Sequence, residues 1–109
     1  MHILLDECLP KNLAEELPGH YVRTVPQAGW AGISNGKLLS LIAASANFEV
    51  FVTVDKNLPQ QNKIKTLPLS AIVLRAKSNR FSHLQAFAPE ILRWLPGLKP
   101  GQVYVLTQP

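Results

Sequence analysis

The sequence has little of several features that would direct its interpretation. Cys8 is its only cysteine, which excludes an internal disulfide and a cysteine-rich zinc site. No apolar run approaches the length of a membrane span, and Asp6 and Glu7 interrupt the first apolar segment where a signal peptide would continue. We therefore expect a cytoplasmic protein in a reducing compartment, with no membrane association.

Charged residues are also scarce, at 17% of the 109 residues, whereas 47% are hydrophobic. A chain of this length is expected to fold as one domain, which here comprises residues 1–109, around a single core. The apolar surplus predicts that one face is covered by a partner or by a second copy in a homodimer. Trp94 is the residue we expect at such a contact, because its indole has an apolar body and a polar edge.

Acidic residues are absent from residues 56–89, in a chain whose formal net charge is +4. The basic residues of this stretch are Lys56, Lys63, Lys65, Arg75, Lys77 and Arg80. Such a stretch is typical either of a solvated face or of a surface that binds a polyanion. The second interpretation assigns nucleic-acid contacts to Lys56, Lys63, Lys65 and Arg80. Trp30 or Phe81 would then stack on unpaired bases, unless they are core or interface residues.

Strand-like and helix-like segments alternate along the chain. Apolar or β-branched runs predict strands at residues 2–5, 20–25, 50–54, 70–74 and 102–107. Such alternation predicts an α/β fold in which helices cover both faces of a mostly parallel sheet of about five strands. We expect the strand at residues 2–5 to be central, with the strand at residues 50–54 beside it.

Helices are expected between these strands, where caps and helical spacing occur. One should begin at Pro10, one after Ser34, and one at Ser82 or Pro89. Pro89 should kink or split the last of these, because a proline inside a helix removes a backbone hydrogen bond. Residues 58–68 are expected to hold at most a short helix.

Acidic residues directly follow two of the expected strands. Asp6 and Glu7 come after the first strand, and Asp55 comes after the strand at residues 50–54. Ligands of an open α/β sheet bind beyond the carboxyl ends of its strands, so the acids of parallel strands should converge there. Converging carboxylates favour a hard cation such as Mg²⁺ or Mn²⁺, which can activate water beside a phosphodiester. Alternatively, each acid only caps a helix or ends a strand in solvent.

Four motifs, in this order, resemble the small PIN-like family of bacterial proteins: ILLDECLPKNLAEEL, GHYVRTV, GWAGISNGKLL and VFVTVDKNLPQQ. That family is often paired with an antitoxin in toxin–antitoxin operons of the VapBC type. The resemblance implies a PIN-like three-layer α/β/α sandwich with a Mg²⁺-dependent ribonuclease centre. Asp6 and Asp55 would match the acids that hold the metal, and Glu7 would be a further ligand or a base. RNA would be the substrate, and a small antitoxin protein the partner.

The chain departs from the family pattern at two positions near these acids. Asn35 stands where many relatives carry an acid at the start of the middle helix. Asn57 stands where relatives can carry a second acid after the strand-end aspartate. Both amides could ligate a metal through their carbonyl oxygens but bring no charge, and Asn35 would otherwise serve the helix start beside Ser34.

The sequence thus leaves three functions open. The first is a metal-dependent ribonuclease toxin, which the matched acids favour. The second is a catalytically weak or silent PIN-like module that binds a protein or RNA, which Asn35 and Asn57 favour. The third is an interaction protein whose basic face serves an acidic antitoxin.

Overall fold

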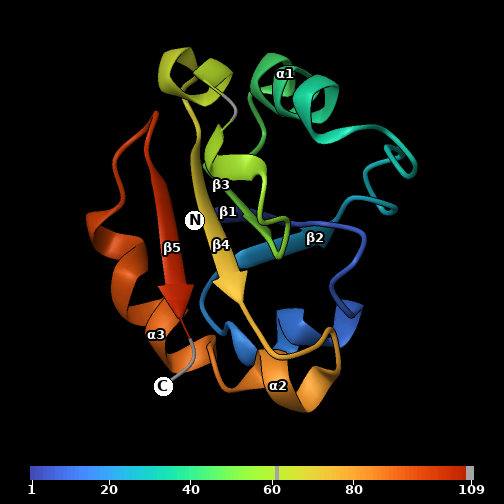
Figure 1. Ribbon diagram of the computed structural model, residues 1–109, viewed down its shortest axis with the longest axis vertical. Helices are drawn as coiled ribbons and strands as arrows, with labels where there is room; N and C mark the ends of the chain where they lie inside the picture. Colours follow the sequence, from blue (N-terminus) through green and yellow to red (C-terminus); the bar gives the residue numbers. More distant parts are fainter. Residues whose placement is uncertain (61, 108–109) are drawn as a thin grey trace.

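The computed structural model describes residues 1–60 and 62–107, and its strands form one all-parallel sheet (Figure 1). The strands are β1 (His2–Leu5), β2 (Tyr21–Thr24), β3 (Val50–Thr53), β4 (Ser70–Arg75) and β5 (Val103–Thr107). Their order across the sheet is β2-β1-β3-β4-β5. The predicted α/β class and parallel sheet are confirmed. The central position expected for β1 is wrong, because β4 and β5 both add beyond β3 and leave β3 in the middle.

The helices are short, and several take the 3-10 form. The α-helices are α1 (Asn35–Ser45), α2 (Phe81–Gln85) and α3 (Ala88–Trp94). The 3-10 helices are η1 (Lys11–Glu16), η2 (Leu58–Gln60), η3 (Asn62–Thr66) and η4 (Leu95–Gly97). Pro89 lies in the first turn of α3, where its missing N–H has no partner to lose, so the predicted split of the last helix is confirmed.

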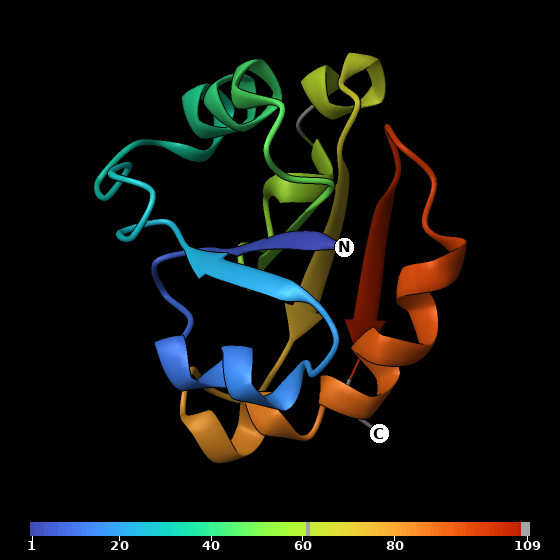
Figure 2. The same ribbon diagram turned by 180° about the vertical axis from the view of Figure 1, so that it is seen from behind.

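Side-chain alternation along the strands divides the core between the two faces of the sheet. On the first face, Ile3 and Leu5 of β1 pack with η1, α2 and α3. On the second face, Leu4 packs with α1 and the segment of η2 and η3. The same division is visible from front and back, with α1 on one side of the sheet and η1, α2 and α3 on the other (Figures 1 and 2). This arrangement is compatible with a three-layer α/β/α sandwich.

The strand order reverses between β1 and β3. From β1 the chain moves outward to β2, returns through α1 to β3 on the other side of β1, and continues outward to β5. β1 and β3 are direct neighbours, with Ile3 opposite Val50 and Leu5 opposite Val52. Their carboxyl ends therefore meet at the point where open α/β sheets bind ligands. Within the described residues, no helix is long and apolar enough to span a membrane.

Candidate functional site at the ends of the first and third strands

Asp6 follows β1 directly and is almost completely buried, with 7% of its surface exposed. Its backbone N–H donates to the carbonyl of Val52 at 2.9 Å and so extends the pairing of β1 with β3. Its carboxylate accepts hydrogen bonds from the backbone N–H of Glu7 at 2.8 Å and from the hydroxyl of Thr53 at 2.6 Å. Both donors are neutral, so they leave the charge of a buried carboxylate uncompensated, which is a setting that suits a cation.

Thr53 connects the ends of the two strands. Its side chain is fully buried, and its hydroxyl donates to Asp6 and accepts from the backbone N–H of Asp55 at 3.1 Å. Sequence reasoning missed this residue, because threonine is an ordinary strand former. The signal was its spacing: Thr53 lies two residues before Asp55, which places both on the same face of the sheet.

Asp55 is half-buried and is held by neutral donors on both carboxylate oxygens. Oδ1 accepts from the backbone N–H of Asn57 at 2.9 Å, and Oδ2 accepts from the side-chain amide of Asn35. Asn35 is the first residue of α1, and Ser34 before it occupies the predicted cap position without a side-chain capping bond. The structure therefore joins Asn35 to Asp55, while Asn57 contributes its backbone and leaves its side chain exposed.

Glu7 lies beside this group but is engaged elsewhere. Both of its carboxylate oxygens accept from the backbone N–H of Gly32, at 3.1 and 3.2 Å. Gly32 belongs to the loop before α1 and has a φ of +80°, which favours glycine. In this arrangement Glu7 fixes the loop to the carboxyl edge of the sheet instead of pointing its charge at Asp6 or Asp55.

Cys8 is half-buried at the same edge. Burial raises the pKa of its thiol, and the nearby carboxylate of Asp6 raises that pKa further. A thiol with a raised pKa is protonated near neutral pH and is a poor nucleophile. Cys8 therefore does not add nucleophilic chemistry to the site.

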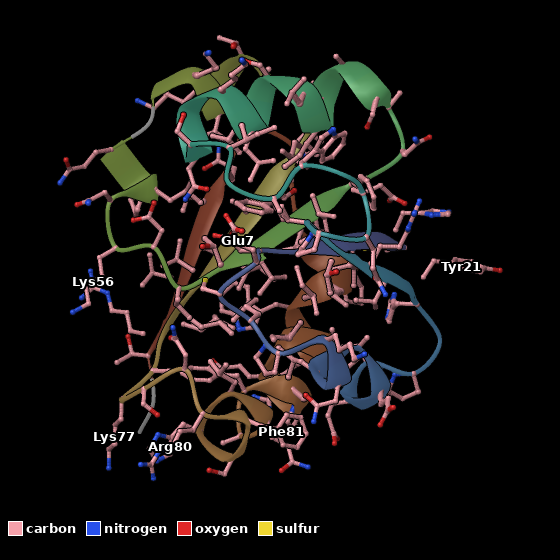
Figure 3. The ribbon with its side chains drawn as sticks, turned by 90° about the vertical axis from the view of Figure 1, so that its right-hand side faces the viewer. Glu7, Tyr21, Lys56, Lys77, Arg80 and Phe81 are labelled. Carbon is pink, nitrogen blue, oxygen red and sulfur yellow. The ribbon has the colours of Figure 1, made fainter. Side chains whose placement is uncertain are left out.

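The basic residues expected at a nucleic-acid surface are divided between two places. Lys56 follows Asp55 directly, and Arg80 follows β4 together with Lys77; these three exposed side chains project on one side of the molecule (Figure 3). Lys63 and Lys65 are exposed on η3, which leads into the start of β4, and Lys63 donates to the hydroxyl of Ser40 at 2.9 Å. The structure thus brings Lys56 and Arg80 to one side and leaves Lys63 and Lys65 near the opposite end of β4.

The two aromatic residues considered for base stacking are both half-buried. Trp30 packs against the core of the second face and meets the ring of Phe48 edge-on, with centroids 6.2 Å apart. Phe81 is the first residue of α2 and lies near Arg80 (Figure 3).

The donor set at the strand ends consists of hard oxygen atoms. Among the described residues, no group of three or more histidine, cysteine, aspartate or glutamate side chains is placed to hold a metal. What the site offers is the carboxylates of Asp6 and Asp55 and the amide oxygen of Asn35, since its bond to Asp55 uses the amide nitrogen. Such a set fits Mg²⁺ or Mn²⁺, which bind through few protein oxygens and keep several waters.

Comparison of the chain with protein-family models, with curated proteins and with solved structures finds no match. The resemblance of its motifs to the PIN-like family is therefore an expectation from sequence. Any assignment of function depends on the geometry at the ends of β1 and β3.

Proposed function

We propose that this protein is a Mg²⁺-dependent ribonuclease with a PIN-like domain, acting as the toxin of a VapBC-like toxin–antitoxin pair. The observation that carries the proposal is the linkage of Asp6 and Asp55 through Thr53 at the reversal point of the sheet. Two carboxylates at this point favour a divalent cation over two free charges, because one of them, Asp6, is almost buried and accepts from two neutral donors.

Each residue of the site has a definite part in this proposal. Asp6 and Asp55 hold the cation, and Thr53 fixes the orientation of the Asp6 carboxylate. Asn35 orients Asp55 and offers its amide oxygen as a further ligand. When bound, the cation supplies positive charge at the scissile phosphodiester and lowers the pKa of water. Glu7 could act as a base only after leaving Gly32.

The exposed side chains of Lys56, Lys77 and Arg80 would bind the phosphate backbone of the RNA. They lie on the loops that follow β3 and β4, which are neighbours in the sheet and end at the same edge as β1. Lys63 and Lys65, at the other end of β4, are outside this path. Lys63 and Lys65 therefore provide a control for the contribution of Lys56, Lys77 and Arg80 to RNA binding.

Cleavage of single-stranded RNA in the presence of Mg²⁺ tests the chemistry. Asp6→Asn and Asp55→Asn should each reduce the rate about 100-fold or more, since loss of even an outer-shell partner commonly costs 10- to 100-fold. Glu49→Gln is the matched control, because Glu49 is a carboxylate at the opposite edge that accepts from the backbone of His2. Equal rates for wild type, Asp6→Asn and Asp55→Asn would overturn the proposal.

Binding of a labelled single-stranded RNA without metal tests the path of the backbone. Replacement of Lys56, Lys77 and Arg80 by alanine should weaken binding. The slope of the logarithm of the binding constant against the logarithm of the salt concentration should become less steep by about 0.7 for each lost phosphate contact. The control is the double variant Lys63→Ala, Lys65→Ala, which should bind almost as well as wild type. A larger loss in the control would contradict the assigned path.

The alternative is a catalytically weak or silent PIN-like module that binds RNA or an antitoxin. This alternative is favoured by the hydrogen bonds of Asp55. Both of its carboxylate oxygens accept from neutral donors, the backbone N–H of Asn57 and the amide of Asn35, and these bonds compete with a metal for the same oxygens. Calorimetric titration with Mn²⁺ distinguishes the two functions. A nuclease should give a binding heat that Asp6→Asn abolishes, whereas a silent module should give no such heat with either protein. A small antitoxin-like reading frame beside the gene would support a toxin pair in either case.

A further inference from the structure

A hollow with a volume of about 550 Å³ lies at the amino end of β1 and β2, away from the carboxylates. Its lining combines His2, Tyr21 and Arg23 from the strands with Asn47 and Phe48, which follow α1. Its volume lies within the range of small-molecule sites. None of its lining residues takes part in the site at the carboxyl edge.

The position of the hollow follows from the topology. β2 lies at one edge of the sheet that the described residues form, and it pairs with β1. Val22 packs toward the first face, so Tyr21 and Arg23 face the same side as α1. Since α1 runs back toward the amino edge, its end and the following loop meet the start of β2 and leave a depression between them.

A preformed aromatic stack lines the hollow. His2 and Tyr21 are directly opposite in the register of β1 and β2, and their rings lie nearly parallel, 4.9 Å apart with 15° between their planes. Tyr21 nevertheless remains 70% exposed and projects outward, on the side away from Lys56, Lys77 and Arg80 (Figure 3). A stacked pair with an open ring face can accept a further flat ring without reorganisation.

The polar groups around this stack suit a nucleotide. Arg23 lies two residues beyond Tyr21 on the same face and lines the hollow, and its guanidinium donates to the carbonyl of Gln27 in the loop after β2 at 3.1 Å. Asn47 is exposed at the rim and offers an amide donor and acceptor for a base edge. Glu49 lies near but accepts from the backbone N–H of His2.

We propose that the hollow binds a nucleoside monophosphate unit, whose base stacks on the Tyr21–His2 pair and whose phosphate contacts Arg23. Stacking on an aromatic platform with a nearby cation is the usual recognition of unpaired nucleotides. The unit can be a free mononucleotide or one residue of single-stranded RNA, which share this chemistry. The proposal does not depend on cleavage or on a metal.

Binding is measured without divalent cations by isothermal titration calorimetry, with adenosine monophosphate in one arm and a short single-stranded oligoadenylate in the other. An oligonucleotide of the same length with abasic sites serves as the ligand control, because it keeps the phosphates and lacks the bases. We expect the base-bearing ligands to bind and the abasic strand to bind at least several-fold more weakly. Preference for one of the two base-bearing arms identifies the source of the unit.

The protein variants test the assigned residues. Tyr21→Ser should weaken binding roughly 5- to 150-fold, as expected for loss of one base-stacking contact, whereas Tyr21→Phe should bind like wild type. Trp94→Ser is the matched control, because Trp94 is also a partly exposed ring in contact with a neighbouring ring, that of Tyr104, on the other side of the sheet. Far-UV circular dichroism verifies that each variant is folded. The proposal is overturned if neither base-bearing ligand binds, if Tyr21→Ser matches wild type, or if the abasic strand binds equally.

Discussion

The Thr53 side chain connects the two strand ends, because its hydroxyl donates to Asp6 and accepts from the backbone N–H of Asp55. Thr53→Val keeps the shape of the side chain but removes the hydroxyl, leaving one bond fewer on a buried carboxylate. We expect a loss of about 1–3 kcal/mol in the free energy of unfolding. Chemical denaturation measures it, and Thr53→Ser should lose much less.

Thr66 provides the control for this prediction. Its hydroxyl also makes a hydrogen bond, to the carbonyl of Lys63 at 2.8 Å, but the residue is exposed. Thr66→Val should therefore change the free energy of unfolding by less than about 0.5 kcal/mol. If Thr53→Val and Thr66→Val had equal effects, the hydroxyl of Thr53 would not be stabilising Asp6.

The pKa of the Cys8 thiol depends on the charge of Asp6. Burial raises the pKa of the Cys8 thiol, and the negative charge of Asp6 raises it further because it disfavours a thiolate nearby. Asp6→Asn removes that charge, so the thiol should ionise at lower pH and be alkylated faster at a given mildly alkaline pH. The measurement is the rate of alkylation by iodoacetamide as a function of pH, whose midpoint should move down.

Glu7→Gln is the matched control for this titration. Glu7 is exposed and engaged with Gly32, and its charge is not among the causes of the raised pKa of Cys8. Its pH profile should coincide with that of wild type. An unchanged or higher midpoint in Asp6→Asn would show that Asp6 carries no charge beside the thiol.

At the scale of elements, the contact between η3 and the turn before β5 depends on Gly101. This residue is buried and has a φ of +84°, and a Cβ added to it would lie 2.9 Å from the backbone oxygen of Lys65. Gly101→Ala combines left-handed strain with a collision against backbone. We expect it to lower the free energy of unfolding by about 2–4 kcal/mol in chemical denaturation.

Substitutions at two other glycines distinguish the cost of left-handed strain from the cost of the collision. Gly19 has a φ of +85° but nothing within 4 Å of an added Cβ, so Gly19→Ala should lose only about 1–2 kcal/mol from strain. Gly97 has neither the positive φ nor a close neighbour, so Gly97→Ala should be close to neutral. If Gly101→Ala cost no more than Gly19→Ala, η3 would not be packed against this turn.

Element positions were predictable where local chemistry decides them. The apolar run at residues 2–5 is β1 as predicted, and Pro89 divides the last helix because a proline fits only in a first turn. The form of η1 was not predictable, since six residues between Pro10 and Leu17 can take either helical form. The order of the strands depends on pairing between distant segments, so the local pattern did not show that β3 is central.

The candidate site was likewise predictable in part. That Asp6 and Asp55 follow adjacent strands could be inferred from the alternation of elements, since parallel strands end at one edge. The engagement of Glu7 with Gly32 could not, because it depends on how the loop before α1 returns to the sheet. The separation of Lys63 and Lys65 from Lys56 also required the path of the chain through η2 and η3.

At the scale of the whole molecule, the β5 side exposes apolar surface. Trp94 is 42% exposed and Val105 is 39% exposed. Association of two copies here stays a prediction from the sequence, and size-exclusion chromatography with light scattering tests it. A dimer that Trp94→Ser converts to monomer would support it, and a monomer at micromolar concentration would contradict it.

The two halves of the core share one sheet, so they should unfold as a single unit. Ile42 of α1 belongs to the core of the second face and Ile91 of α3 to that of the first, and both are fully buried. Replacing either by valine removes one methylene from its core. Each change should lower the free energy of unfolding by about 0.5–1.5 kcal/mol, because the packing around the missing group relaxes only partly.

The two tryptophans provide separate reports on the two faces. Trp30 packs against the core of the second face, whereas Trp94 lies at the end of α3 on the first. In single-tryptophan proteins made by Trp94→Phe or Trp30→Phe, the fluorescence midpoints in denaturant should each coincide with the midpoint from circular dichroism. Ile42→Val should then shift the Trp94 signal as much as the Trp30 signal, because strands β1, β3 and β4 contribute residues to both cores. A shift confined to Trp30 would mean that α1 can separate from the sheet while the first face remains folded. Because Asn35 is the first residue of α1, Asp55 would then lose the hydrogen bond from the Asn35 amide before the protein unfolds.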